Sequence, residues 1–73
     1  MALKTETNTR AMMNQVLKAA RSRFPRKHAD AFFEHGQWWV SLRDGSQYSV
    51  VDAEGPGSIN GFDFEMVTEP YDN

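Results

Sequence analysis

The sequence predicts a single small α+β domain in which one N-terminal helix packs on a three- to four-stranded antiparallel sheet, in the order α-β-β-β-β. Two patterns predict this class. Apolar residues recur at helical spacing over residues 10–23, and the spacing changes to strict alternation after residue 30, as in strands that bury one face. The chain has 73 residues and no cysteine, so we expect one domain without disulfides.

The helix is predicted over residues 10–23. Thr9 or Thr7 can cap its first turn, because a hydroxyl accepts from a free backbone N–H there. Pro25 ends it, since proline lacks a donor and disfavours helical geometry in the residue before it. The predicted buried stripe has the spacing of one helix face and contains Met13, Val16, Leu17, Ala20 and Phe24.

Alternating segments predict strands over residues 31–34, 37–43, 47–52 and 62–67. His35 and Gly36 suit a two-residue turn between the first two strands. Residues 54–61 contain three glycines and one proline and are expected to form a loop. We expect residues 1–8 and 68–73 to be flexible tails.

The turns also predict the register. A two-residue first turn pairs Phe33 with Trp38 and Phe32 with Trp39. For the apolar faces of the second and third strands to match, their connection must contain three or five residues, or a bulge at Gly45. The strand residues then expected in the core are Phe33, Trp38, Val40, Leu42, Tyr48, Val50, Phe62, Phe64 and Met66.

Charge is unevenly distributed along the chain. Residues 1–43 contain all eight basic residues and three acids, and residues 44–73 contain seven acids and no base, for a net charge of −2. Such asymmetry indicates an interaction role, unless the two halves simply neutralise each other in the fold.

Signatures of catalysis and of metal or cofactor binding are absent from the sequence. His28 and His35 lack a third ligand at metal spacing, and no serine lies in a nucleophile motif. We therefore expect no enzyme activity, no cofactor and no metal. No apolar stretch approaches the roughly 20 residues that span a bilayer or forms a signal core, so we expect a protein without membrane contact that is cytoplasmic or is released inside a host cell.

The candidate site is the sheet face that points away from the helix. Adjacent strand residues point to opposite faces, so Trp38 and Trp39 cannot both be buried by one helix. The residues expected to form a protein-binding surface are Phe32, Trp39, Val51, Asp63 and Glu65. Their partner would be another protein, or a second copy of the chain in a homodimer. Alternatively, the N-terminal tail or the 54–61 loop covers Trp39.

A nucleic-acid-binding regulator is the alternative function. It would use the basic helix stripe and the connector after it, through Arg10, Lys18, Arg21, Arg26 and Lys27. The isoelectric point near 5.5 argues against nucleic acid as the main ligand. A solvated helix face explains the same residues without any ligand.

No family resemblance is identified from the residues. We expect a small adaptor, inhibitor or regulator. Its size and lack of catalytic motifs are compatible with an accessory protein of a phage or another mobile element, an expectation that rests on those two features alone.

Overall fold

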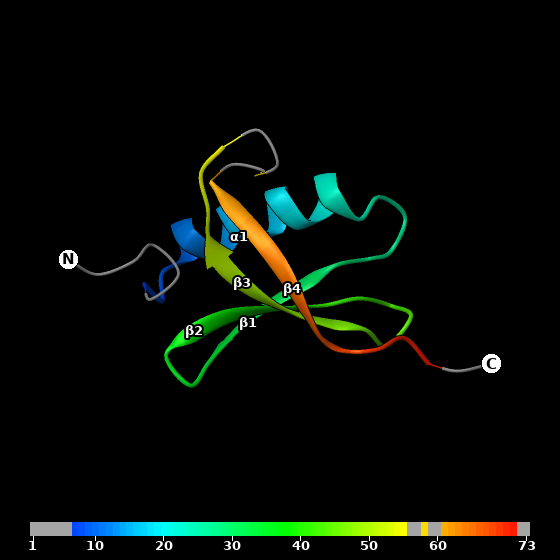
Figure 1. The fold of residues 1–73 in the computed structure, drawn as a ribbon. Coiled ribbons are helices and arrows are strands. Elements are labelled where there is room, and N and C mark those ends of the chain that lie inside the picture. The colour runs from blue at the N-terminus through cyan, green and yellow to red at the C-terminus, as the bar shows by residue number, and fades with distance from the viewer. Residues whose placement is uncertain (1–6, 56–57, 59–60, 72–73) are drawn as a thin grey trace.

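The computed structural model describes residues 7–55, 58 and 61–71, and Figure 1 shows a helix lying on one side of a four-stranded antiparallel sheet. The elements are α1 (Arg10–Arg23), β1 (Asp30–Glu34), β2 (Gln37–Ser41), β3 (Gln47–Asp52) and β4 (Phe62–Thr68). The strands lie side by side in their order along the chain. The predicted class and element order are confirmed.

Helix α1 has the predicted boundaries. Thr9 is extended and caps the first turn, its hydroxyl accepting from the Met12 N–H at 3.1 Å. At the other end the Phe24 N–H donates to the Ala20 carbonyl at 2.8 Å. Pro25 follows and has no N–H to continue the helix.

The buried face of α1 differs from the predicted one. Its buried side chains are Met12, Val16, Ala19 and Ala20. Met13 and Leu17, which the prediction placed in the core stripe, are half-buried at its edge. Alanine side chains are small, so the helix can lie close to β1 and β2, against which it mainly packs. Periodicity alone could not choose between two overlapping apolar stripes.

The first hairpin has the predicted register. Phe33 pairs with Trp38 and Phe32 with Trp39. Both residues of the turn, 35–36, have positive φ, 54° and 77°, as the favoured two-residue hairpin turn requires. Phe33 and Trp38 therefore share the helix side, with ring centroids 5.4 Å apart, and Phe32 and Trp39 face away from the helix.

Three residues separate Leu42 from Ser46 in the connection between β2 and β3, which is one of the predicted alternatives. The Leu42 N–H donates to the Ser46 carbonyl at 2.9 Å, and the Gly45 N–H donates to the Leu42 carbonyl at 3.0 Å. Gly45 has a φ of 90°, as in a turn closed by a glycine bulge. Val40 consequently lies opposite Tyr48.

Strand β4 contains a predicted core residue that lies outside the core. Val50 is opposite Phe64, and Tyr48 is opposite Met66. The Phe24 ring, at the end of α1, packs on Tyr48 and Phe64 with centroids 4.6 and 5.5 Å apart. Met66 is 49% exposed, so its predicted burial is wrong. The reason is that α1 packs mainly against β1 and β2, away from this edge strand.

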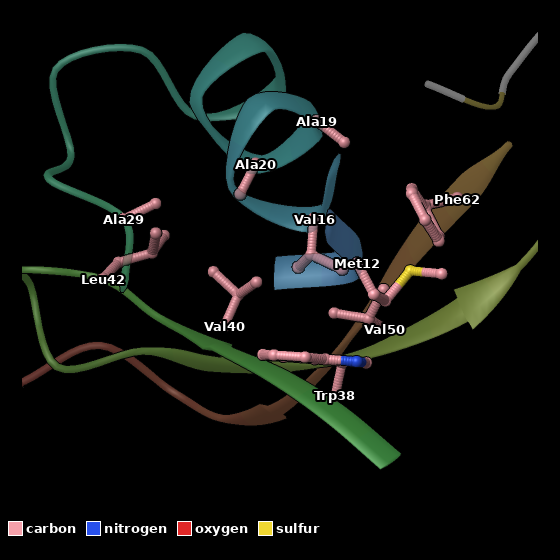
Figure 2. Close-up of a cluster of buried hydrophobic side chains, with 10 residues drawn as sticks. All are labelled: Met12, Val16, Ala19, Ala20, Ala29, Trp38, Val40, Leu42, Val50 and Phe62. Carbon is pink, nitrogen blue, oxygen red and sulfur yellow. The ribbon is translucent and has the colours of Figure 1, made fainter. Parts of the chain in front are cut away.

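Figure 2 shows the core between α1 and the sheet, with Trp38, Val40 and Val50 pointing toward the helix. Trp38 is 3% exposed, and its indole Nε1 donates to the Thr7 carbonyl at 2.8 Å. The buried cluster contains Met12, Val16, Ala19, Ala20, Ala29, Trp38, Val40, Leu42, Val50 and Phe62. The first of the two adjacent tryptophans is thus a core residue.

Asp44, in the connection between β2 and β3, links three segments. Its carboxylate accepts from the Ser46 hydroxyl and, at 2.9 Å, from the Ser46 N–H, and forms a 3.0 Å ion pair with Lys27 Nζ. Its carbonyl accepts from the Tyr71 N–H at 2.8 Å, and the Arg43 N–H donates to the Lys27 carbonyl at 2.8 Å. The α1–β1 connector and the chain after β4 are both held by this turn.

The predicted tail boundaries change as a result. Thr68 belongs to β4, and Tyr71 is bonded to the backbone of Asp44. Residues 1–6 and 72–73 of the predicted tails lie outside the described part of the chain.

Gly45→Ala is expected to lower the free energy of unfolding by about 1–2 kcal/mol, because an L-residue at positive φ is strained. An added Cβ would also lie 2.6 Å from the Tyr71 ring, but Tyr71 is 74% exposed and can move. In urea denaturation, Gly45→Ala should therefore lower the free energy of unfolding by the same amount whether residue 71 is tyrosine or alanine. Full recovery of stability with alanine at residue 71 would show that the ring contact, and not the backbone, sets the cost.

The contacts of Asp44 in this turn should also make the stability of the fold depend on pH in the acid range. Hydrogen bonds from the Ser46 hydroxyl and N–H, and then from Lys27, lower the pKa of Asp44 from 3.8 to about 2. A depressed folded-state pKa stabilises the fold above the unfolded value, near pH 3.8, and this contribution is lost as the pH falls toward 2. The stability difference between wild type and Asp44→Asn should therefore shrink over that range in urea titrations.

Carbon-detected NMR titration of the Asp44 carboxylate tests the cause. Because the Ser46 hydroxyl contributes most, Ser46→Ala should raise the Asp44 pKa further than Lys27→Gln does. The reverse order would assign the shift to the ion pair instead.

Candidate functional site

The five residues predicted for protein binding lie together on the sheet face that points away from α1. Phe32 is opposite Trp39, Trp39 is opposite Ser49, and Ser49 is opposite Glu65, so one row crosses all four strands. At the usual strand spacing this row is about 14 Å long. Val51 and Asp63 form the neighbouring cross-strand pair on the same face. We call these residues and their neighbours in the strands the open face.

Trp39 forms the centre of the apolar part of the open face. It is half-buried between its neighbours, and its indole Nε1 donates to the Glu34 carbonyl at 2.9 Å. The ring is thus held across the β1–β2 hairpin with its polar atom satisfied, next to Phe32. A rigid, partly exposed tryptophan beside a phenylalanine is the type of anchor found at the centre of protein interfaces.

The predicted cover for Trp39 is not found in the described part of the chain. Thr7, where the described chain begins, bonds to Trp38 and so lies on the helix side. The other predicted cover was the 54–61 loop, of which residues 56–57 and 59–60 lie outside the described residues.

Polar residues that the sequence analysis did not select complete the open face. Gln37 Nε2 donates to Ser49 Oγ at 3.0 Å, and Ser49 is almost fully buried beneath its neighbours. Thr68 Oγ1 donates weakly to Gln47 Oε1 at 3.4 Å. Strand alternation places Gln37, Gln47 and Ser49 on this face, whereas Thr68 lies opposite Gln47 because the β3–β4 pairing shifts register between Gln47 and Tyr48.

The open face is acidic. The four strands contain no lysine, arginine or histidine. The pairing places four carboxylates on this face: Asp30, Glu34, Asp63 and Glu65. A cluster of one sign around an apolar centre repels nucleic acid and attracts cationic partners.

The basic residues of the alternative prediction separate into three groups. Arg10 and Lys18 are exposed on α1. Arg21 and Arg26 meet in a groove at the end of the helix. Lys27 is paired with Asp44, and its role in a nucleic-acid surface stays a prediction.

A second hollow of about 580 Å³ adjoins the loop after β3 and is lined by Asp52, Ala53, Glu54 and Gly61. One Asp52 carboxylate oxygen, Oδ1, is buried there without a hydrogen-bond partner in the described structure. Across the described residues, no three histidine, aspartate or glutamate side chains gather as metal ligands would.

Comparisons with protein-family models, curated proteins and solved structures find no match to this chain. In the part of the chain that the structure describes, no helix is long and apolar enough to cross a lipid bilayer.

The two tryptophans should differ in solvent access, because Trp38 is 3% exposed and Trp39 is half-buried on the open face. Trp38→Phe leaves Trp39 as the only tryptophan, and Trp39→Phe leaves Trp38, so each can be followed by excitation selective for tryptophan. Acrylamide should quench the Trp38→Phe variant more strongly. Equal quenching at all protein concentrations would mean that the chain itself covers Trp39.

Proposed function

We propose that the protein is a non-enzymatic protein-binding domain, an adaptor, inhibitor or regulator, and that its open face is the binding surface. The observation that carries the proposal is that Phe32, Trp39 and Val51 share the side of the sheet without the helix, with Phe32 and Trp39 directly opposite each other. The helix covers the other face of the sheet. We propose the cytoplasm as its compartment, which the lack of cysteine fits.

The charge of the open face selects the kind of partner. Four carboxylates and no strand base surround the apolar centre, so the complementary surface presents an apolar side chain among lysine or arginine residues. Unlike charges of this kind accelerate association and exclude partners of the wrong sign.

A symmetric homodimer through the same face is less favourable. Each copy would bring its own four carboxylates, including Asp63 and Glu65, toward those of the other copy, and no base in the strands could neutralise them. Like charges that meet in an interface cost several kcal/mol.

A displayed library of random peptides provides a partner-independent test. Selection on the wild-type protein should enrich sequences with basic residues beside an aromatic or large aliphatic residue. Trp39→Ala should weaken binding of the enriched peptides by at least about 30-fold, as for an interface hot spot. Glu65→Lys should weaken binding most at low salt, because it reverses a charge beside the anchor.

Glu54→Lys is the matched control, because it makes the same charge change at an exposed loop position outside the strands. Its binding should stay near that of wild type. Circular dichroism must show each variant folded, and Glu65→Lys, which leaves the core untouched, remains informative if Trp39→Ala is unstable. Peptides that bind all four proteins alike would refute the open face as the site, and concentration-dependent dimers lost in Trp39→Ala would assign it to self-association.

A further inference from the structure

A surface groove of about 480 Å³ lies where α1 passes into the connector to β1. It is lined by Arg21, Phe24, Arg26, His28, Ala29 and Asp30. Basic side chains thus outnumber the single carboxylate, and none of the five predicted protein-binding residues takes part. The groove adjoins the open face at one residue, because Asp30 belongs to both.

The connector between α1 and β1 contains three successive basic residues whose side chains have different surroundings. Lys27 turns to Asp44 and pairs with it at 3.0 Å, while Arg26 and His28 on either side line the groove. Both of these have left-handed backbone, with φ of 71° and 51°. Such a conformation costs about 1 kcal/mol or more for each non-glycine residue.

Contacts with Arg43 and Asp44, in the β2–β3 connection, hold this left-handed backbone conformation in place. The Lys27 carbonyl accepts from the Arg43 N–H at 2.8 Å, in addition to the Lys27 side-chain contact with Asp44. The backbone that carries Arg26 and His28 is therefore fixed in place before any ligand arrives. A prearranged site loses less conformational entropy on binding.

The guanidinium groups of Arg21 and Arg26 have no carboxylate partner within ion-pair distance in the described part of the chain. Arg23, next to the groove, lies over the Phe24 ring at 5.1 Å. Asp30 and the negative end of the α1 dipole oppose an anion, but the two guanidinium charges exceed the one carboxylate. We infer that this groove binds a phosphate group, whose geometry matches the planar fork of arginine.

Phosphate groups of this kind occur both in nucleic-acid backbones and in small phosphorylated molecules. Arg10 and Lys18 are exposed on α1, which at 14 residues is about 21 Å long. A nucleic-acid strand anchored in the groove could continue along these residues, whereas a small molecule could not use them. The inference stands independently of the proposed function of the open face.

Titration of the isotope-labelled protein by NMR tests the site with three probes at low salt: inorganic phosphate, adenosine monophosphate and a 12-nucleotide single-stranded DNA. Each probe that binds should shift the amide signals of residues 21–30. Arg26→Gly is the central variant, because it removes the whole side chain with its guanidinium while glycine suits the left-handed backbone at this position. It should weaken binding by about tenfold, the expected loss for one charge-assisted contact.

Arg10→Ala is the matched control, since it removes the same charge at the far end of α1 and should leave phosphate and nucleotide binding unchanged. Tighter binding of the DNA, with a salt dependence reduced by about one unit in Arg26→Gly, identifies a nucleic-acid backbone as the source. Equal binding of nucleotide and DNA identifies a small phosphorylated ligand. Absence of shifts at residues 21–30, or equal losses in Arg26→Gly and Arg10→Ala with inorganic phosphate, would overturn the site.

Discussion

The register between β2 and β3 is the constraint on which the rest of the structure depends. It is set by the short connection in which the Leu42 N–H bonds to the Ser46 carbonyl and Gly45 takes positive φ. A slip of one residue would exchange the faces of the side chains of β3 relative to β2, turning Tyr48 and Val50 toward the open face and Ser49 and Val51 toward the helix. Because the same connection also holds the α1–β1 connector and the chain after β4, the sheet and both neighbouring segments share one anchor.

In this arrangement the helix layer and the sheet layer carry charges of opposite sign. Helix α1 contains basic residues and no acid, whereas the strands contain acids and no base. Among the described residues, Lys27 and Asp44 form the only ion pair between residues 1–43 and 44–73, so most of the charge difference between the two halves of the sequence is left unpaired there. The two layers therefore present surfaces of opposite charge.

Local signals in the sequence predict much of the fold. Thr9 and Pro25 predict the ends of the helix, and the His35–Gly36 turn predicts the first hairpin. Alternation predicts that the β2–β3 connection needs three or five residues or a bulge at Gly45, and it places the five predicted binding residues on one face. Which apolar stripe of α1 is buried depends on how the helix packs on the sheet. The burial of Met12 and Ala19 is a result of that packing, and the helical spacing of the sequence does not contain it. The partner of Lys27 is Asp44, 17 residues away, and such a contact leaves no pattern in the local sequence. The role of the open face in binding stays a prediction.

The separation of charge between the layers also gives the molecule a permanent electric dipole moment, directed from the strands toward α1. A small body with such a moment turns in the field of a charged surface before it touches that surface. The domain would therefore arrive at a cationic surface sheet first and at an anionic surface helix first, although its net charge is only −2. Its orientation on approach, and not its overall charge, would govern how quickly it finds each kind of ligand.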